Sequence, residues 1–179
     1  MKRIITMITP VLAMLVLGTT GRAQGATGTT ILSVAVAAEA SLTVNTGTSS
    51  LTATAGTFAN NFAGTTSLTY KIRTTKTGGT GTITAKVTTD FGGTGGPSVL
   101  TPPTAGDALT YTCTVATPGT ACTSQTASTT AATGPATFGT DAKSASAGNS
   151  ASVAWTLTND PQYSTGTYTA TVTFTISAT

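Results

Sequence analysis

The chain has no histidine, and its 179 residues include only 5 acidic residues and 2 cysteines. Without an imidazole it lacks the usual base that activates a serine or cysteine nucleophile and the usual nitrogen ligand of zinc sites. Asp107 and Asp160 offer oxygen ligands for calcium, but neither lies in an Asp-x-Asp-x-Asp-Gly loop. We therefore expect a protein that is not an enzyme and that has no cofactor or metal site.

Charge is also scarce, because Asp, Glu, Lys and Arg together make up 7% of the chain. The formal net charge of +3 comes from Lys2, Arg3 and Arg22, and the basic and acidic residues that follow them cancel. A nearly neutral surface gives no electrostatic attraction to nucleic acid, and it offers little repulsion between copies of the same chain. We expect no nucleic-acid partner and tolerance of close self-association.

The start of the chain has the order of a secretory signal peptide. Basic residues are followed by an apolar run at residues 4–17 and then by small and polar residues. A transmembrane helix needs about 18 or more apolar residues, whereas this run is shorter and contains Pro10. We expect residues 1–23 to be removed, with cleavage between Ala23 and Gly25. Residues 24–179 would then form one secreted or cell-surface domain, exported through the periplasm and without a membrane span.

The composition predicts a fold built from strands. Roughly a quarter of the residues are threonine, whose branched side chain disfavours helices and suits strands. Apolar residues recur at every second position in many segments, and Gly, Pro and Asn separate these segments. We expect an all-β fold, an antiparallel immunoglobulin-like β-sandwich of about seven to nine strands, with a closed barrel as the alternative.

Two long alternating segments lie near the ends of this domain. Residues 31–44 are expected to form one strand, whose first apolar positions are Leu32, Val34, Val36 and Ala38. Residues 168–179 are expected to form the terminal strand, with a hydroxyl face of Thr and Ser and a core face of Tyr168, Ala170, Val172, Phe174 and Ile176. Trp155 shares one face of another strand with Val153 and Leu157, and it is the expected aromatic residue of the core.

Two hairpins are expected in the middle of the chain. The first joins residues 67–74 to residues 82–88 through a glycine-containing loop. The second places Cys113 directly opposite Cys122, within reach of a disulfide, if residues 116–119 form a four-residue loop. An even pair of cysteines in an oxidising compartment is most simply a structural disulfide. The Gly- and Pro-rich residues 91–106 are expected to form a long surface loop.

The closing segment, residues 164–176 (STGTYTATVTFTI), resembles the last strand of secreted bacterial immunoglobulin-like surface proteins. Among these it is similar to the spore coat protein U-like, archaic chaperone–usher pilin group, whose domains also end on a Gly-x-Tyr alternating strand. The resemblance implies a fold that lacks one strand and is completed by the N-terminal extension of the next subunit. Such a donor strand has the apolar spacing found here at Leu32, Val34, Val36 and Ala38. The alternative is that these residues form the first strand of a self-contained domain.

The sequence favours a non-enzymatic, exported structural or fimbrial-type cell-surface subunit. Its partners would be copies of itself or other surface subunits, and the resemblance implies chaperone–usher machinery. The alternative is a monomeric binding or adhesion module that recognises a surface or a glycan through loops such as residues 91–106. The two hypotheses differ in whether the N-terminal alternating segment pairs within its own domain or with a neighbouring copy.

Overall fold

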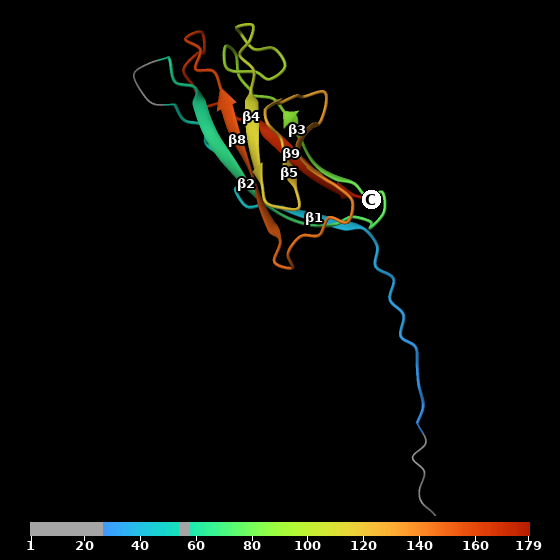
Figure 1. Cartoon of the computed structure of the whole chain (residues 1–179). Helices are drawn as coiled ribbons and strands as arrows, with labels where there is room; N and C mark the ends of the chain where they lie inside the picture. Colours follow the sequence, from blue (N-terminus) through green and yellow to red (C-terminus); the bar gives the residue numbers. More distant parts are fainter. Residues whose placement is uncertain (1–26, 54–57) are drawn as a thin grey trace, which may run out of the picture. The chain divides into compact units, whose positions relative to one another are not determined.

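The computed structural model describes residues 27–53 and 58–179, and this part contains nine strands and no helix (Figure 1). The signal peptide expected at residues 1–23 and its cleavage site lie outside the described residues. The chain divides into two units, Met1–Val34 and Ala35–Thr179, and all nine strands belong to the second. The strands are β1 (Glu39–Val44), β2 (Phe62–Arg73), β3 (Gly81–Thr89), β4 (Thr110–Val115), β5 (Thr120–Ala121), β6 (Gln125–Thr126), β7 (Thr133–Phe138), β8 (Asn149–Leu157) and β9 (Thr171–Ala178).

The strands pair antiparallel in two sheets that share one apolar core. One sheet has the order β1-β2-β8-β4-β6, and the other has the order β5-β7-β3-β9. Tyr70 of β2 lies against Phe138 of β7, with ring centroids 5.0 Å apart, and Trp155 of β8 lies 6.4 Å from Phe174 of β9. These contacts join the inner faces of the two sheets. The expected all-β antiparallel sandwich is confirmed.

Alternation along the strands decides which side chains fill this core. Val153, Trp155 and Leu157 of β8 point inward, and none is more than 5% exposed, which confirms Trp155 as a core residue. The indole Nε1 of Trp155 donates to Thr66 Oγ1 at 2.9 Å, so its one polar atom is paired. The sequence pattern therefore predicted the inner face of this strand correctly.

The prediction that residues 67–74 and 82–88 pair as a hairpin is wrong. β2 pairs with β1 and β8, whereas β3 pairs with β7 and β9 in the other sheet. The glycine-containing connection, in which Gly78 has a φ of 68°, carries the chain from one sheet to the other. An alternating pattern says which face of a strand is buried, but not which strand lies beside it, because both arrangements bury the same side chains.

The disulfide between Cys113 and Cys122 is present, with its Cα atoms 5.3 Å apart, but the expected placement of the two cysteines directly opposite one another on paired strands is wrong. β4, which contains Cys113, pairs with β6 and β8, whereas β5, which ends just before Cys122, pairs with β7 in the other sheet. The expected turn at residues 116–119 does form, because the Gly119 amide donates to the Ala116 carbonyl oxygen at 3.0 Å. The disulfide therefore ties the two sheets together where the chain crosses between them.

Candidate functional site

The apolar positions before β1 lie in an exposed stretch without regular secondary structure. Residues 31–38, called the N-terminal segment below, belong to no strand. The exposed fraction is 90% for Leu32, 86% for Val34 and 63% for Val36, and Ala38 is half-buried. Burying a large apolar side chain contributes roughly 1.5–3 kcal/mol, and these exposed side chains do not gain that stabilisation within the folded chain.

The strand expected at residues 31–44 is shorter than predicted and begins at Glu39. Glu39 pairs with Arg73, which is the last residue of β2. Among residues 27–53 and 58–179, no strand lies beside residues 31–38 in this sheet, and alternation alone cannot supply the missing backbone hydrogen bonds. The expected donor-strand residues Leu32, Val34, Val36 and Ala38 are therefore not part of β1, and their role as a donor strand stays a prediction.

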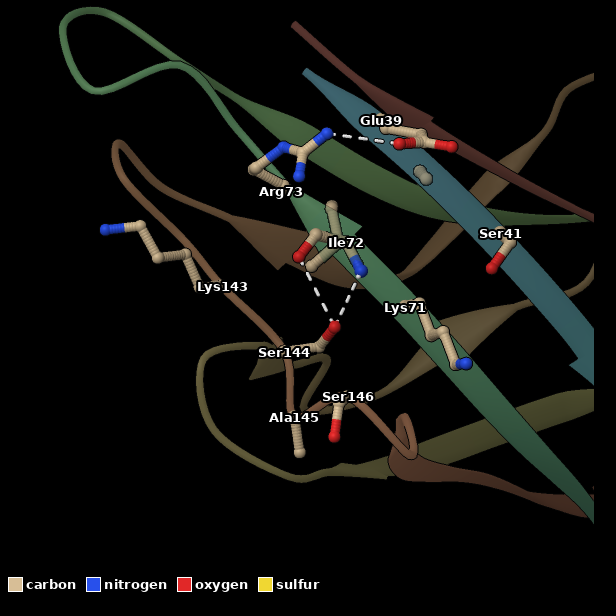
Figure 2. Close-up of a pocket in the computed structure, with 10 residues that line it drawn as sticks. Glu39, Ser41, Lys71, Ile72, Arg73, Lys143, Ser144, Ala145 and Ser146 are labelled. Carbon is tan, nitrogen blue, oxygen red and sulfur yellow. Dashed lines mark hydrogen bonds and ion pairs between the residues drawn. The ribbon is translucent and has the colours of Figure 1, made fainter. Parts of the chain in front are cut away.

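Arg73 holds the backbone at the point where the N-terminal segment joins β1. Its Nε donates to the carbonyl oxygen of Ala37 at 2.7 Å. Its Nη2 forms an ion pair with Glu39 at 3.1 Å, drawn as a dashed line in Figure 2. The C-terminal end of the segment is thus fixed to the edge of the sandwich, while the side chains of Leu32, Val34 and Val36 remain exposed.

A hollow of about 390 Å³ lies beside this anchor. Lys71 and Lys143 line it, but their side chains extend in different directions in Figure 2. The Lys143 ammonium is paired with Asp141 at 2.7 Å, and the Ser144 hydroxyl is bonded to the backbone of Ile72. The hollow has mixed charge and no converging set of donors, so we assign it no ligand.

The terminal strand β9 is an edge strand with a half-exposed apolar face. Within the part of the chain that the structure describes, it pairs only with β3, at the end of the four-stranded sheet. The apolar residues of the partner strand β3 are buried, whereas those of β9 are only half-buried. The expected core-face residues Val172, Phe174 and Ile176 lie on β9, and Tyr168 and Ala170 precede the strand, which begins at Thr171.

The first strand β1 is the edge of the other sheet, and it lies beside β9 across the sandwich. Its apolar residues are also incompletely covered, and Val44 is 43% exposed. Among the described residues, none of the buried apolar residues of the core comes from β1 or β9. The two edge strands that lie side by side, β1 and β9, therefore contribute only incompletely covered apolar side chains to the sandwich.

The loop expected at residues 91–106 is present between β3 and β4, and one carboxylate organises it. Asp90 accepts hydrogen bonds from the Ser98 hydroxyl (2.7 Å) and from the amides of Phe91 (2.8 Å), Val99 (2.7 Å) and Leu100 (3.1 Å). Burial alone would raise the pKa of Asp90, but these hydrogen bonds outweigh it and lower the pKa. The sequence pattern did not reveal that Asp90 organises this loop, because the hydrogen-bond partners of Asp90 lie in a segment without periodicity.

The same loop is packed against the connection between β8 and β9. The Ser164 amide donates to the Gly95 carbonyl oxygen at 2.7 Å. The Tyr168 ring lies over Gly93 and Gly96, where an added Cβ would overlap the ring. The loop is thus held in one shape, and Leu100, which is 62% exposed, is its most exposed large apolar side chain.

No group of three or more His, Cys, Asp or Glu side chains that could hold a metal ion occurs in residues 27–53 and 58–179. Over the same residues no helix is long and apolar enough to cross a membrane. Comparison of the chain with protein-family models, with curated proteins and with solved structures finds no match.

Proposed function

We propose that the protein is an exported, non-enzymatic structural subunit that assembles with copies of itself by strand addition. In this assembly the N-terminal segment of one copy pairs with the free edge of β9 in the next. The observation that carries the proposal is the match between an exposed alternating segment and an edge strand whose apolar face is half-covered.

Assembly would bring together an open sheet edge and an exposed apolar segment, and both would be covered in the contact. An added strand supplies backbone hydrogen bonds to an open sheet edge, and its alternate side chains fill the positions beside it. Leu32, Val34, Val36 and Ala38 would cover the half-buried residues of β9, and both surfaces would leave water. Because the donor and the acceptor are different surfaces of the chain, the contact joins copies head to tail and produces a filament.

Export is part of the same proposal. The order of basic, apolar and small residues at the start is typical of a signal peptide, and the Cys113–Cys122 disulfide suits an oxidising compartment. The near absence of net charge after residue 23 permits copies to pack closely. A secreted or cell-surface location reached through the periplasm, with chaperone–usher machinery as the assembly partner, is consistent with these features.

Size-exclusion chromatography of mature protein with and without residues 24–38 tests the proposal. Deletion should leave the disulfide-bonded sandwich folded and abolish assembly into larger species. A finer pair of variants separates the face that contains Leu32, Val34 and Val36 from the opposite face, which contains Ser33: Val34→Asp should prevent assembly, whereas Ser33→Asp should permit it. A full-length mature protein that stays a stable monomer at high concentration, without a chaperone, would contradict the proposal.

A second candidate function is a monomeric adhesion module, and the ordered loop at residues 91–106 favours it. Asp90 and Tyr168 hold this loop in one conformation, and a pre-shaped loop with an exposed Leu100 suits recognition of a surface or a glycan. Glycan-array binding that is lost in Leu100→Ala, but unchanged on deletion of residues 24–38, would favour this function over the structural one.

A further inference from the structure

The ladder between β1 and β2 stops at the point where the N-terminal segment joins β1. Its last pair is Glu39 with Arg73, and the same register continued by two residues would place Ala37 opposite Thr75. Neither Ala37 nor Thr75 is a proline, the residue that cannot donate to a ladder. The local sequence therefore does not explain why the pairing ends here.

The backbone of Thr75 is bonded to other segments instead. Its amide donates to the carbonyl oxygen of Thr179, which follows β9, at 2.9 Å, and its carbonyl oxygen accepts from the Asp141 amide at 3.0 Å. A backbone amide has a single hydrogen, so Thr75 cannot also donate to the carbonyl oxygen of Ala37. The chain that follows Arg73 is therefore bonded away from β1, and this ends the ladder.

The side chain of Arg73 supplies the donor that the backbone does not. Its Nε donates to the carbonyl oxygen of Ala37 at 2.7 Å, and its Nη2 lies 3.1 Å from the carboxylate of Glu39 (Figure 2). A guanidinium presents its donors in a rigid planar fork, so it holds two acceptors in a fixed relation to one another. Because these acceptors lie two residues apart, the fork fixes the backbone between them.

We propose that Arg73 is a positioning residue for the assembly described above: it fixes the C-terminal end of the N-terminal segment before a second copy binds. The inference rests on the proposed function and adds to it the residue that prepares the donor. A segment that is ordered in advance loses less conformational entropy on binding, so its affinity is higher. The partner is a second copy of the chain, whose edge strand β9 would receive the segment.

The size of the effect follows from the entropy of the backbone that Arg73 holds. Fixing the backbone of one residue changes an equilibrium constant by roughly 5- to 30-fold. The side chains of Arg73 and Glu39 are 42% and 78% exposed, and contacts between charged groups in water are weak. We therefore expect the lower end of this range, a loss of about 5- to 10-fold in assembly when the contact is removed.

The first test compares Arg73→Ala with Lys71→Ala by size-exclusion chromatography over a range of concentrations. Lys71 lies on the same face of β2, two residues earlier and opposite Ser41, and its side chain extends away from Glu39 in Figure 2. Arg73→Ala should need about 5- to 10-fold more protein to assemble to the same extent as the wild type. Lys71→Ala should assemble as the wild type does.

Two further variants separate the two contacts of Arg73. Arg73→Lys keeps a positive charge beside Glu39 but loses the planar fork that reaches Ala37, so it should assemble as poorly as Arg73→Ala. Glu39→Gln removes the ion pair and keeps the hydrogen bond to Ala37, so it should remain close to the wild type. The opposite ranking of these two variants would overturn the role given to the hydrogen bond with Ala37.

Nitrogen-15 relaxation of the monomer at low concentration tests the positioning directly. In Arg73→Ala the backbone order parameters of Ala37 and Ala38 should fall from about 0.85 to below about 0.6, whereas Lys71→Ala should leave them unchanged. Urea unfolding should be nearly the same for both variants, because neither side chain belongs to the core. A purely structural role for Arg73 would instead lower the stability of the sandwich.

The outcomes separate this inference from the proposed function. A wild type that forms no larger species contradicts the proposed function. A wild type that assembles, together with an Arg73→Ala variant that assembles at the same concentration, overturns the inference alone. Order parameters at Ala37 and Ala38 that are equal in the wild type and in Arg73→Ala would overturn it in either case.

Discussion

Ile83 of β3 and Ile176 of β9 lie directly opposite one another, yet only one of them is buried. Ile83 is 0% exposed, whereas Ile176 is half-buried, although both residues belong to inward-facing alternating rows. The difference arises because β3 has a strand on each side and β9 has a strand on one side only. The edge position, and not the sequence pattern, determines how well this apolar face is covered.

The same substitution at these two positions should therefore have unequal effects. Ile83→Ala leaves a cavity in the centre of the core and should lower the free energy of unfolding by about 2–5 kcal/mol. Ile176→Ala removes a side chain that water already reaches, and it should cost about 1–2 kcal/mol in the monomer. Urea unfolding of both variants measures the difference, and equal costs would show that the face of β9 is covered in solution.

Removal of the disulfide should destabilise the folded chain but should not prevent folding. Cys113 and Cys122 are 9 residues apart, and closing a loop of that size contributes about 2–3 kcal/mol, mainly by restricting the unfolded chain. Urea unfolding of the double variant Cys113→Ser, Cys122→Ser should show this loss. Wild-type protein treated with a thiol reductant is the matched control and should lose the same amount; a wild type insensitive to reduction would contradict the prediction.

The hydroxyl of Thr66 should contribute more to the stability of the fold than the volume of the Thr66 side chain does. Thr66→Val leaves the buried Nε1 of Trp155 without its acceptor, and an unpaired buried donor costs about 1–3 kcal/mol. Thr65→Val, at the exposed neighbouring position of β2, should change stability little. Thermal unfolding and the fluorescence of Trp155 report both effects, and the prediction fails if the two variants are equally stable.

Acid should weaken the loop at residues 91–106 through Asp90. The hydrogen bonds to this carboxylate lower its folded pKa, so the folded chain binds fewer protons than the unfolded chain in acid. The stability that Asp90 contributes is therefore present above about pH 3.9 and is lost as pH falls through its lowered pKa.

Asp90→Asn should remove this acid dependence and leave the loop more mobile at neutral pH. Limited proteolysis of residues 91–106 across the acid range measures both effects. The exposed variant Asp141→Asn is the control, and an Asp90→Asn loop that is as protected as the wild-type loop would count against this role.

Much of the local structure could be predicted from the residues alone, since alternation is a property of neighbouring positions. The inner faces of β8 and β9 were recognised from their own sequences, and the Cys113–Cys122 pair was recognised from its count and spacing. The pairing of β2 with β3 and the direct opposition of Cys113 and Cys122 on paired strands were predicted wrongly. A turn that crosses between two sheets contains the same residue types as a turn within one sheet, so its composition cannot distinguish them.

The sequence by itself determined that this chain forms strands, which side of each strand is apolar, and that imidazole chemistry is absent. Only the tertiary structure decided that β9 is an edge and that residues 31–38 have no strand beside them. These features depend on which distant segments pack together, and long-range packing leaves no mark in the periodicity of any single segment.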